Sequence, residues 1–283
     1  MQIKRKFFMD NEKTDFFHEN GYIVLENYFD IESEIRPIQR AIYEIVGLIM
    51  RRRSLHIERE DFNGDNFDSG FLKLLQKDRE FGREMYDQAK QIPEFLRLIC
   101  SQKSEDLFKS IRSTDLSGIG AASYGIRIDN PGEEEFRSQW HQEFTFQPQS
   151  KDGIVFWTPL LPITQQLGPV QICPKSHQDG LRKFARGGDY AEKAGAYQMG
   201  LENEAEVISG YDVVSPLTKP GDLLLMDFCT IHQSGFNVGA RARWSIQHRF
   251  FNFREATGIK LGWKGSVTSG VSIEDTFKDY FKE

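Results

Sequence analysis

The stretch that decides the fold reads Gly221-Asp222-Leu223-Leu224-Leu225-Met226-Asp227-Phe228-Cys229-Thr230-Ile231-His232. A Gly-Asp turn pair precedes an apolar run of strand length, and a polar turn separates that run from the histidine. A continuous apolar run between turn signals is typical of a buried strand. We therefore expect a sheet in the core, with a histidine just beyond the end of one of its strands.

Strand signals recur around this stretch, mostly in the second half of the chain. The candidate strands are residues 22–25, 121–129, 154–161, 170–173, 213–214, 223–228 and 244–253. Most are short, and Pro and Gly turns separate them. This pattern predicts a mainly β fold with flanking helices, of the jelly-roll or barrel type.

The first part of the chain has helical periodicity instead. Helices are expected at residues 11–20, 31–50, 71–89, 94–100 and 107–111. We predict a helical part, about residues 1–115, followed by a jelly-roll core, about residues 117–255. Residues 183–210 are polar and Gly-rich with little periodicity, so we expect an insertion or lid loop there. A length of 283 residues allows two domains, but double-sheet β folds also reach this size as one unit, and we predict a single domain, residues 1–283.

Composition narrows the class of protein. Hydrophobic residues make up 39% of the chain and charged residues 28%, which is typical of a soluble globular protein. The net charge of −6 argues against a nucleic-acid partner, because phosphate binding needs a basic face. No apolar stretch approaches the about 18 residues that a membrane helix needs.

The cysteines and the N-terminus indicate the compartment. Cys100, Cys173 and Cys229 are far apart and odd in number, which indicates neither a disulfide framework nor a zinc site. Residues 1–9 are basic but lack the apolar region of a secretory signal. We therefore expect a reducing, cytoplasmic setting.

Two of the six histidines stand out. His141 lies in Trp140-His141-Gln142-Glu143, and in a strand the side chains of residues i and i+2 point to the same face. His141 and Glu143 can therefore aim at one point, and His232 is the candidate third ligand. Two histidines and one carboxylate form the facial triad of non-haem iron sites, which leaves positions open for a 2-oxo acid and dioxygen.

The other histidines have simpler explanations. His18 and His56 lie in the helical part and are expected to have surface or packing roles. His177 follows a turn and is expected to form hydrogen bonds there. His248 lies among large apolar residues and is expected to be a core histidine.

An arginine downstream of His232 strengthens the metal hypothesis. Arg243 follows His232 by eleven residues, on a predicted strand. A guanidinium fork matches a carboxylate, so a buried arginine beside a metal site suggests a dicarboxylate ligand. Arg241 and Arg249 are expected to be ordinary surface charges.

Taken in order, these motifs resemble the phytanoyl-CoA dioxygenase-like group of iron(II)/2-oxoglutarate oxygenases. The resemblance covers most of the chain, from the segment at residues 16–25 to Arg243. Its carriers are His141-Gln142-Glu143, Gly168-Pro169-Val170-Gln171-Ile172-Cys173-Pro174-Lys175-Ser176-His177, Gly221-Asp222-Leu223-Leu224-Leu225-Met226-Asp227 and His232-Gln233-Ser234-Gly235-Phe236-Asn237. The group's arginine also stands eleven residues after its second histidine, and Arg243 matches it.

The resemblance implies a double-stranded β-helix, the cupin-like jelly roll, in a single catalytic domain. It implies that His141, Glu143 and His232 bind iron(II), and that Arg243 pairs with the far carboxylate of 2-oxoglutarate. Further candidates for the cosubstrate site are Ser234, Trp157 and Tyr124. The candidates for shaping a substrate pocket are Phe144 and Phe146, and for the last four residues core packing is an equal alternative.

One departure concerns the carboxylate ligand, which is usually Asp in this group and is Glu143 here. The extra methylene requires a different rotamer if the carboxylate is to reach the metal. The resemblance predicts hydroxylation of an unactivated C–H bond of a small molecule, in secondary or specialised metabolism, with dioxygen as oxidant. Two alternatives stay open: the same cofactors could support desaturation, cyclisation or epimerisation, or the chain could be a non-catalytic jelly-roll binding protein with a degenerate metal site.

Overall fold

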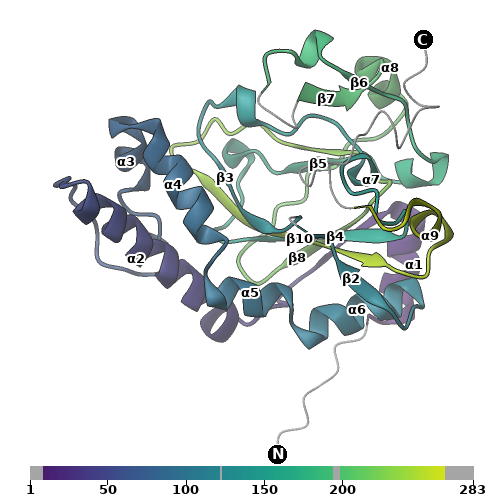
Figure 1. The fold of residues 1–283 in the computed structure, drawn as a ribbon, viewed down its shortest axis with the longest axis horizontal. Coiled ribbons are helices and arrows are strands. Elements are labelled where there is room, and N and C mark those ends of the chain that lie inside the picture. The colour runs from purple at the N-terminus through teal and green to yellow at the C-terminus, as the bar shows by residue number, and fades with distance from the viewer. Residues whose placement is uncertain (1–8, 122, 194–197, 265–283) are drawn as a thin grey trace, which may run out of the picture.

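The centre of the computed structural model is an antiparallel sheet of order β1-β8-β4-β10-β2, with β3 paired to β10 as well (Figure 1). The structure describes residues 9–121, 123–193 and 198–264. The strands of this sheet are β1 (Tyr22–Leu25), β2 (Ser117–Ile119), β3 (Gly125–Asp129), β4 (Gly153–Pro159), β8 (Leu223–Asp227) and β10 (Arg243–Asn252). The predicted decisive stretch is thus confirmed as β8, an interior strand between β1 and β4.

A second, smaller sheet makes the fold two-layered. It pairs β5 (Val170–Ile172) with β9 (His232–Ser234). Side chains that alternate along β4 and β8 share one hydrophobic cluster with residues of the second layer, namely Val155, Trp157, Leu224, Met226, Val170 and Ile172. Two antiparallel layers around such a core are the predicted jelly roll.

Helices cover the opposite face of the main sheet. They are α2 (Arg36–Arg52), α3 (Phe71–Lys77), α4 (Arg79–Ala89), α5 (Pro93–Ile99) and α6 (Gln102–Arg112). The largest hydrophobic cluster joins their apolar stripes to the other faces of the strands; its members include Ile38, Ile42, Phe71, Phe95, Phe108, Phe156, Leu225, Trp244, Ile246 and Phe250. This packing leaves the face of the sheet that points away from the helices for a site.

Two predicted helices are each divided in the structure. The helix expected at residues 31–50 begins with a π-helical segment, Ile31–Ile35, before α2. The helix expected at residues 71–89 breaks at Asp78, whose backbone is extended and whose side chain accepts a hydrogen bond from the Glu80 amide at 2.9 Å. Asp78 therefore caps a new helix, which the apolar periodicity alone did not reveal.

The N-terminal helix α1 (Asn11–Asn20) is tied to the end of β8. Gly21 ends the helix at φ 74° and its carbonyl accepts hydrogen bonds from the Asp227 amide at 2.8 Å and the Thr230 hydroxyl at 2.8 Å. A Cβ on Gly21 would lie 2.3 Å from Thr230 Oγ1. Only glycine therefore fits both the left-handed backbone and the close approach.

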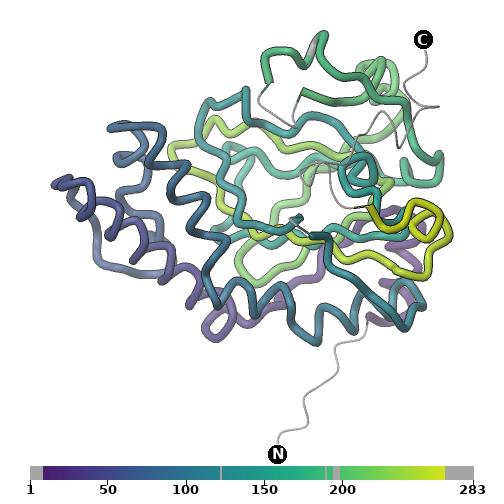
Figure 2. Tube along the Cα trace, in the orientation of Figure 1, coloured from purple at the N-terminus to yellow at the C-terminus, as the bar shows by residue number. Residues whose placement is uncertain are grey.

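The segment expected as an insertion or lid loop has more structure than that prediction implied. It contains the hairpin of β6 (Phe184–Arg186) and β7 (Met199–Leu201), followed by α8 (Glu204–Ser209). Residues 194–197 lie outside the described part of the chain. Figure 2 shows this green segment on one side of the sheet and the purple and blue helical part on the other.

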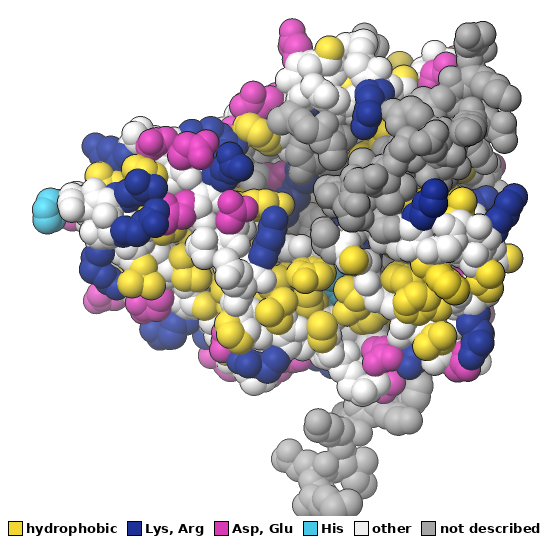
Figure 3. All heavy atoms as spheres, in the orientation of Figure 1, with side chains coloured by type: hydrophobic (Ala, Val, Ile, Leu, Met, Phe, Trp, Pro, Cys, Tyr) yellow, Lys and Arg dark blue, Asp and Glu magenta, His cyan; other side chains and the backbone are white. Residues whose placement is uncertain are grey.

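Figure 3 shows a band of hydrophobic side chains across the face on which β2 and α9 (Ala256–Leu261) lie, with charged side chains concentrated toward the α2–α4 end. Within the described residues, no helix has the length and apolar character required to cross a membrane.

Candidate metal centre

The two candidate ligand histidines are brought together by their own backbones. His141 and His232 form an isolated antiparallel bridge, and each donates its amide to the carbonyl of the other at 3.0 Å. His232 is also the first residue of β9, so the bridge fixes His141 to the smaller sheet. The ring centroids lie 4.3 Å apart. Residues 91 positions apart in sequence therefore become neighbours through backbone pairing.

Both imidazole rings are oriented for metal binding. His141 Nδ1 lies 2.7 Å from the Gln139 carbonyl, and His232 Nδ1 lies 2.9 Å from the Thr230 carbonyl. Because a carbonyl only accepts, each Nδ1 carries the hydrogen, and the lone pair is left on Nε2. Burial, followed by the nearby His141, lowers the pKa of His232 to about 3, so this ring is neutral at physiological pH.

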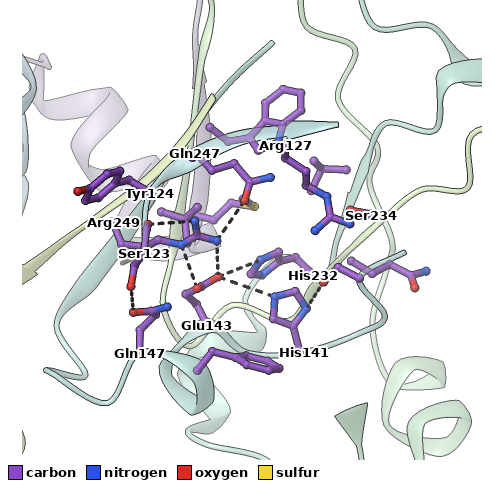
Figure 4. A pocket seen from close by; sticks show the side chains of 18 of the residues that line it. Ser123, Tyr124, Arg127, His141, Glu143, Gln147, His232, Ser234, Gln247 and Arg249 are labelled. Atoms are coloured by element: carbon purple, nitrogen blue, oxygen red, sulfur yellow. Dashed lines mark hydrogen bonds and ion pairs between the residues drawn. The ribbon is translucent and has the colours of Figure 1, made fainter. Parts of the chain in front are cut away.

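Glu143 completes the set. Its Oε2 lies 3.8 Å from His141 Nε2 and 3.9 Å from His232 Nε2, and the three ligand atoms all lie within 4.8 Å of one another. All three residues are buried or nearly so, and Figure 4 shows them converging on one point. Two imidazole nitrogens and one carboxylate, all on one side, are the donor set of a facial triad.

The local structure differs from the strand that the sequence predicted. His141 belongs to an isolated bridge, and Glu143 is the first residue of the one-turn helix α7 (Glu143–Phe146). Gln142 between them has an extended backbone, and its side-chain Nε2 donates to the carbonyls of Gly180 and Cys229. The predicted alternation of side chains is therefore present, although the segment is not a regular strand.

Arg249 was predicted to be a surface charge, and that prediction is wrong. It lies on β10 with a side chain only 16% exposed, and its Nε donates to Glu143 Oε1 at 3.0 Å. Burial raises the pKa of the Glu143 carboxyl, but Arg249 and the two nearby histidines together outweigh burial and hold that pKa well below its usual value. The sequence did contain a signal for this role. Arg249 and Arg243 are an even number of residues apart on one strand, so their side chains point to the same face of the sheet.

A cavity of about 210 Å³ adjoins the three ligands. Of the predicted site residues, Trp157, Tyr124, Ser234 and Phe146 line it. Phe144 does not: it is 1% exposed and packs in the hydrophobic cluster between the two layers. Of the two roles that the sequence left open for Phe144, this position supports core packing.

Arg243 lies behind the cavity rather than at its wall. Its side chain is fully buried, its Nη2 donates to Asp129 Oδ2 at 2.8 Å, and its Nη1 donates to the Gly168 carbonyl. The cavity is instead lined by Arg127. Arg127 lies on β3 two residues before Asp129, which is the residue paired with Arg243 in the β10–β3 register. A direct contact between Arg243 and a cosubstrate therefore stays a prediction.

Asp129 joins the two arginines into one network. Arg127 Nε lies 2.8 and 3.0 Å from the two Asp129 oxygens. Burial raises the pKa of Asp129, but the charges of Arg127 and Arg243 lower it to about 2. Two guanidinium groups thus share one carboxylate, which leaves one net positive charge at this end of the cavity. The hydroxyl of Ser245, opposite Arg127 in the β10–β3 register, is buried and has no hydrogen-bond partner among the described residues.

The remaining histidines lie outside the site. His177 Nε2 lies 3.0 Å from the His18 carbonyl of α1, so its bonding partner is that helix rather than its own turn. His248 is 1% exposed between Phe156 and Phe250, and neither of its ring nitrogens has a hydrogen-bond partner in the described part of the chain. It is a core histidine, as predicted, but an unsatisfied one.

Comparisons with known proteins agree with this geometry. The sequence profile of the phytanoyl-CoA dioxygenase family matches residues 17–245. A comparison with curated proteins gave no match. Among solved structures, the chain is similar to EctD from S. alaskensis with bound Fe, at 18% identity and a TM-score of 0.56, covering 86% of this chain and 77% of that one.

Two further solved structures come from nogalamycin biosynthesis. SnoK, a non-haem alpha-ketoglutarate-dependent carbocyclase, is 14% identical with a TM-score of 0.56, and the match covers 91% of this chain and 92% of that one. SnoN, an epimerase with the same dependence, is 12% identical with a TM-score of 0.50, covering 88% and 86%. At these identities the likeness shows the fold alone, and it confirms the predicted jelly roll.

Proposed function

Because this chain belongs to the phytanoyl-CoA dioxygenase family, we propose that it hydroxylates an unactivated C–H bond of a small molecule. It is a non-haem iron(II) and 2-oxoglutarate-dependent oxygenase. The observation that carries the finer proposal is the buried set of His141, Glu143 and His232 at the wall of a cavity. Iron bound there would supply the oxidising chemistry, with dioxygen and the cosubstrate as reactants.

The residues around the ligands have distinct proposed roles. The backbone bridge between His141 and His232, and the carbonyls that hold each Nδ1, orient the two Nε2 lone pairs before any metal binds. Trp157 and Phe146 line the cavity and exclude water from it, and Phe146 packs edge-on against His141 at 5.3 Å. The protein therefore supplies fixed donors and a partly apolar wall.

The cosubstrate is proposed to lie between the metal ligands and the Arg127 end of the cavity. Figure 4 shows Arg127 pointing into the cavity on the side of Ser234. The net positive charge shared by Arg127, Asp129 and Arg243 suits the distal carboxylate of 2-oxoglutarate. Arg127 would meet that carboxylate at the wall, and Arg243 would contribute from behind through Asp129. This extends the sequence prediction, which paired Arg243 with the distal carboxylate and named Ser234, Trp157 and Tyr124 as further candidates for the cosubstrate site.

The test is anaerobic addition of iron(II) and 2-oxoglutarate, followed by visible spectroscopy. We expect a weak charge-transfer band in the wild type and no band in His141→Ala or His232→Ala. Arg127→Gln should require a higher 2-oxoglutarate concentration to form the band. A band that persists in both histidine variants would show that these residues are not the ligands.

The reaction outcome needs a separate measurement. The folds of a carbocyclase and an epimerase are similar to this one, and they bear on the fold only. Mass spectrometry of the product distinguishes the outcomes, because hydroxylation adds one oxygen, desaturation removes two hydrogens and epimerisation leaves the mass unchanged. A non-catalytic binding protein would form no succinate in any substrate-dependent way.

A further inference from the structure

Arg249 holds both oxygens of the Glu143 carboxylate, and one of them also faces the two histidines. Arg249 donates Nε to Oε1 at 3.0 Å and Nη2 to Oε2 at 3.3 Å. The oxygen that faces both histidine Nε2 atoms, at 3.8 and 3.9 Å, is Oε2 (Figure 4). Oε1 is therefore committed to the arginine, whereas Oε2 also faces the site.

Arg249 is itself held by two partners besides Glu143. Its Nη1 donates to the Ser123 carbonyl at 3.2 Å and its Nη2 to Gln247 Oε1 at 3.1 Å. The rigid guanidinium fork presents its donors in one plane, and three different partners occupy it. The position of the fork on β10 therefore sets the orientation of the Glu143 carboxylate.

The number of oxygens that Glu143 gives to a metal decides how many positions remain. An octahedral ion with two imidazoles and one carboxylate oxygen keeps three positions, enough for a chelating 2-oxo acid and dioxygen. If Glu143 chelated through both oxygens, only two positions would remain and the cosubstrate would compete with dioxygen. Glutamate has one more rotatable bond than aspartate, so it has more freedom to turn both oxygens toward the metal.

We infer that Arg249 is a positioning residue that restricts Glu143 to one coordinating oxygen, Oε2, and so keeps a third position open. The inference rests on the proposed function, because it concerns a metal bound by His141, Glu143 and His232. It also accounts for glutamate at a position where aspartate is usual. The arginine limits the freedom that the extra methylene introduces.

The charge of Arg249 determines in which direction the metal affinity should change when the arginine is removed. A cation paired with Glu143 withdraws negative charge from the metal ligand, so removal of Arg249 leaves the carboxylate a stronger donor. Metal alone should then bind to Arg249→Gln at least as tightly as to the wild type. Binding of 2-oxoglutarate should weaken by about tenfold or more, because the freed Oε1 competes for a position. A merely structural role would weaken both together.

The experiment uses the full chain, anaerobically. Cobalt(II) titration, followed by its visible absorption, measures metal affinity, and the iron(II) charge-transfer band measures 2-oxoglutarate affinity. Variants are Arg249→Gln and Arg249→Lys, which keeps the charge and loses the fork. The control is Arg112→Gln, because Arg112 is a similarly buried arginine that pairs with Asp152 and Asp227 away from the cavity. Unfolding by urea shows whether each variant is folded.

The outcomes separate the two claims. Unchanged or tighter cobalt binding, with about tenfold weaker 2-oxoglutarate binding in Arg249→Gln and not in Arg112→Gln, supports the inference. Equal losses of metal and cosubstrate affinity, or no change in cosubstrate affinity, overturn it while leaving the proposed function in place. If Arg249→Gln binds no metal because it is unfolded, Arg249→Lys provides the test. That variant must then show unchanged or tighter cobalt binding together with weaker 2-oxoglutarate binding. A wild type that binds no metal overturns both.

Discussion

Asp129→Asn tests the charge network at the end of the cavity. The carboxylate of Asp129 is shared by the fully buried Arg243 and by Arg127, whose side chain is 15% exposed. The drop in its pKa from 3.8 to about 2 corresponds to about 2 to 3 kcal/mol, at about 1.4 kcal/mol per pKa unit. Removing one partner of a buried ion pair costs about 3 to 5 kcal/mol, which is consistent with that figure.

We therefore expect Asp129→Asn to lower the free energy of unfolding by about 3 kcal/mol. For a chain of this size the melting temperature should fall by about 6 to 12 °C. The sign with pH is fixed by the depressed pKa: the contribution of Asp129 is complete above about pH 4 and is lost as the pH falls toward 2. The variant should lack that part of the acid-induced loss of stability.

The variant should also respond differently to the cosubstrate. With Asp129 neutral, two guanidinium groups lack a carboxylate, and the distal carboxylate of 2-oxoglutarate can replace it. Under anaerobic conditions with iron(II), 2-oxoglutarate should therefore raise the melting temperature of Asp129→Asn by several degrees more than that of the wild type, at about 2 to 4 °C per kcal/mol.

Two controls make this result decisive. 2-Oxobutyrate has the chelating 2-oxo acid but no distal carboxylate, so it should give no extra rescue. Asp68→Asn removes another carboxylate, which is paired with Arg241 and whose side chain is 9% exposed, and it should lose stability without any cosubstrate-specific rescue. An equal thermal response to 2-oxoglutarate in Asp129→Asn and the wild type would refute the proposal that this network receives the diacid.

Three further predictions concern other parts of the molecule. Burial, followed by the charge of Arg249, lowers the pKa of His248 to about 3, so the fold loses stability as the pH falls below about 6.5. Between pH 8 and 5.5, His248→Phe should lose about 1 kcal/mol less of its free energy of unfolding than the wild type, as urea unfolding at both pH values would show. Gly21→Ala should cost about 2 kcal/mol or more, because φ is 74° and the new Cβ would lie 2.3 Å from Thr230 Oγ1; a loss below about 0.5 kcal/mol in urea unfolding would contradict this. Removal of metal by a chelator should lower the melting temperature of the wild type and leave His232→Ala unchanged, as calorimetry would show.

Much of the fold followed from the sequence because its strands carry strong local signals. Residues 22–25 were predicted as a strand and are β1, and the apolar runs at 154–161 and 223–228 became β4 and β8. Helix boundaries were harder: the break at Asp78 depends on a side-chain cap that competes with an uninterrupted apolar stripe. The hairpin of β6 and β7 was missed because neither strand has the alternating pattern that would identify it.

The site was predictable where spacing carries the information and not where tertiary pairing does. The convergence of His141 and His232 was expected from the motif order, and their backbone bridge explains it. The roles of Arg249 and Arg127 depend on which side chain reaches a carboxylate across strands, which one sequence does not encode locally. The same holds for Arg243. Its ion-pair partner, Asp129, lies more than a hundred residues away in the sequence, so the pairing could not be read from the residues near Arg243.

The hairpin of β6 and β7 pairs only with itself among the described strands, yet it borders the first metal histidine. A small cleft between the two is lined by His141, Phe146, Phe184 and Met199. An insertion, a deletion or an exchange within the hairpin would leave every strand register of the main sheet as it is. Sequence changes in this hairpin can therefore reshape the wall beside His141 while the strands of the main sheet keep their partners.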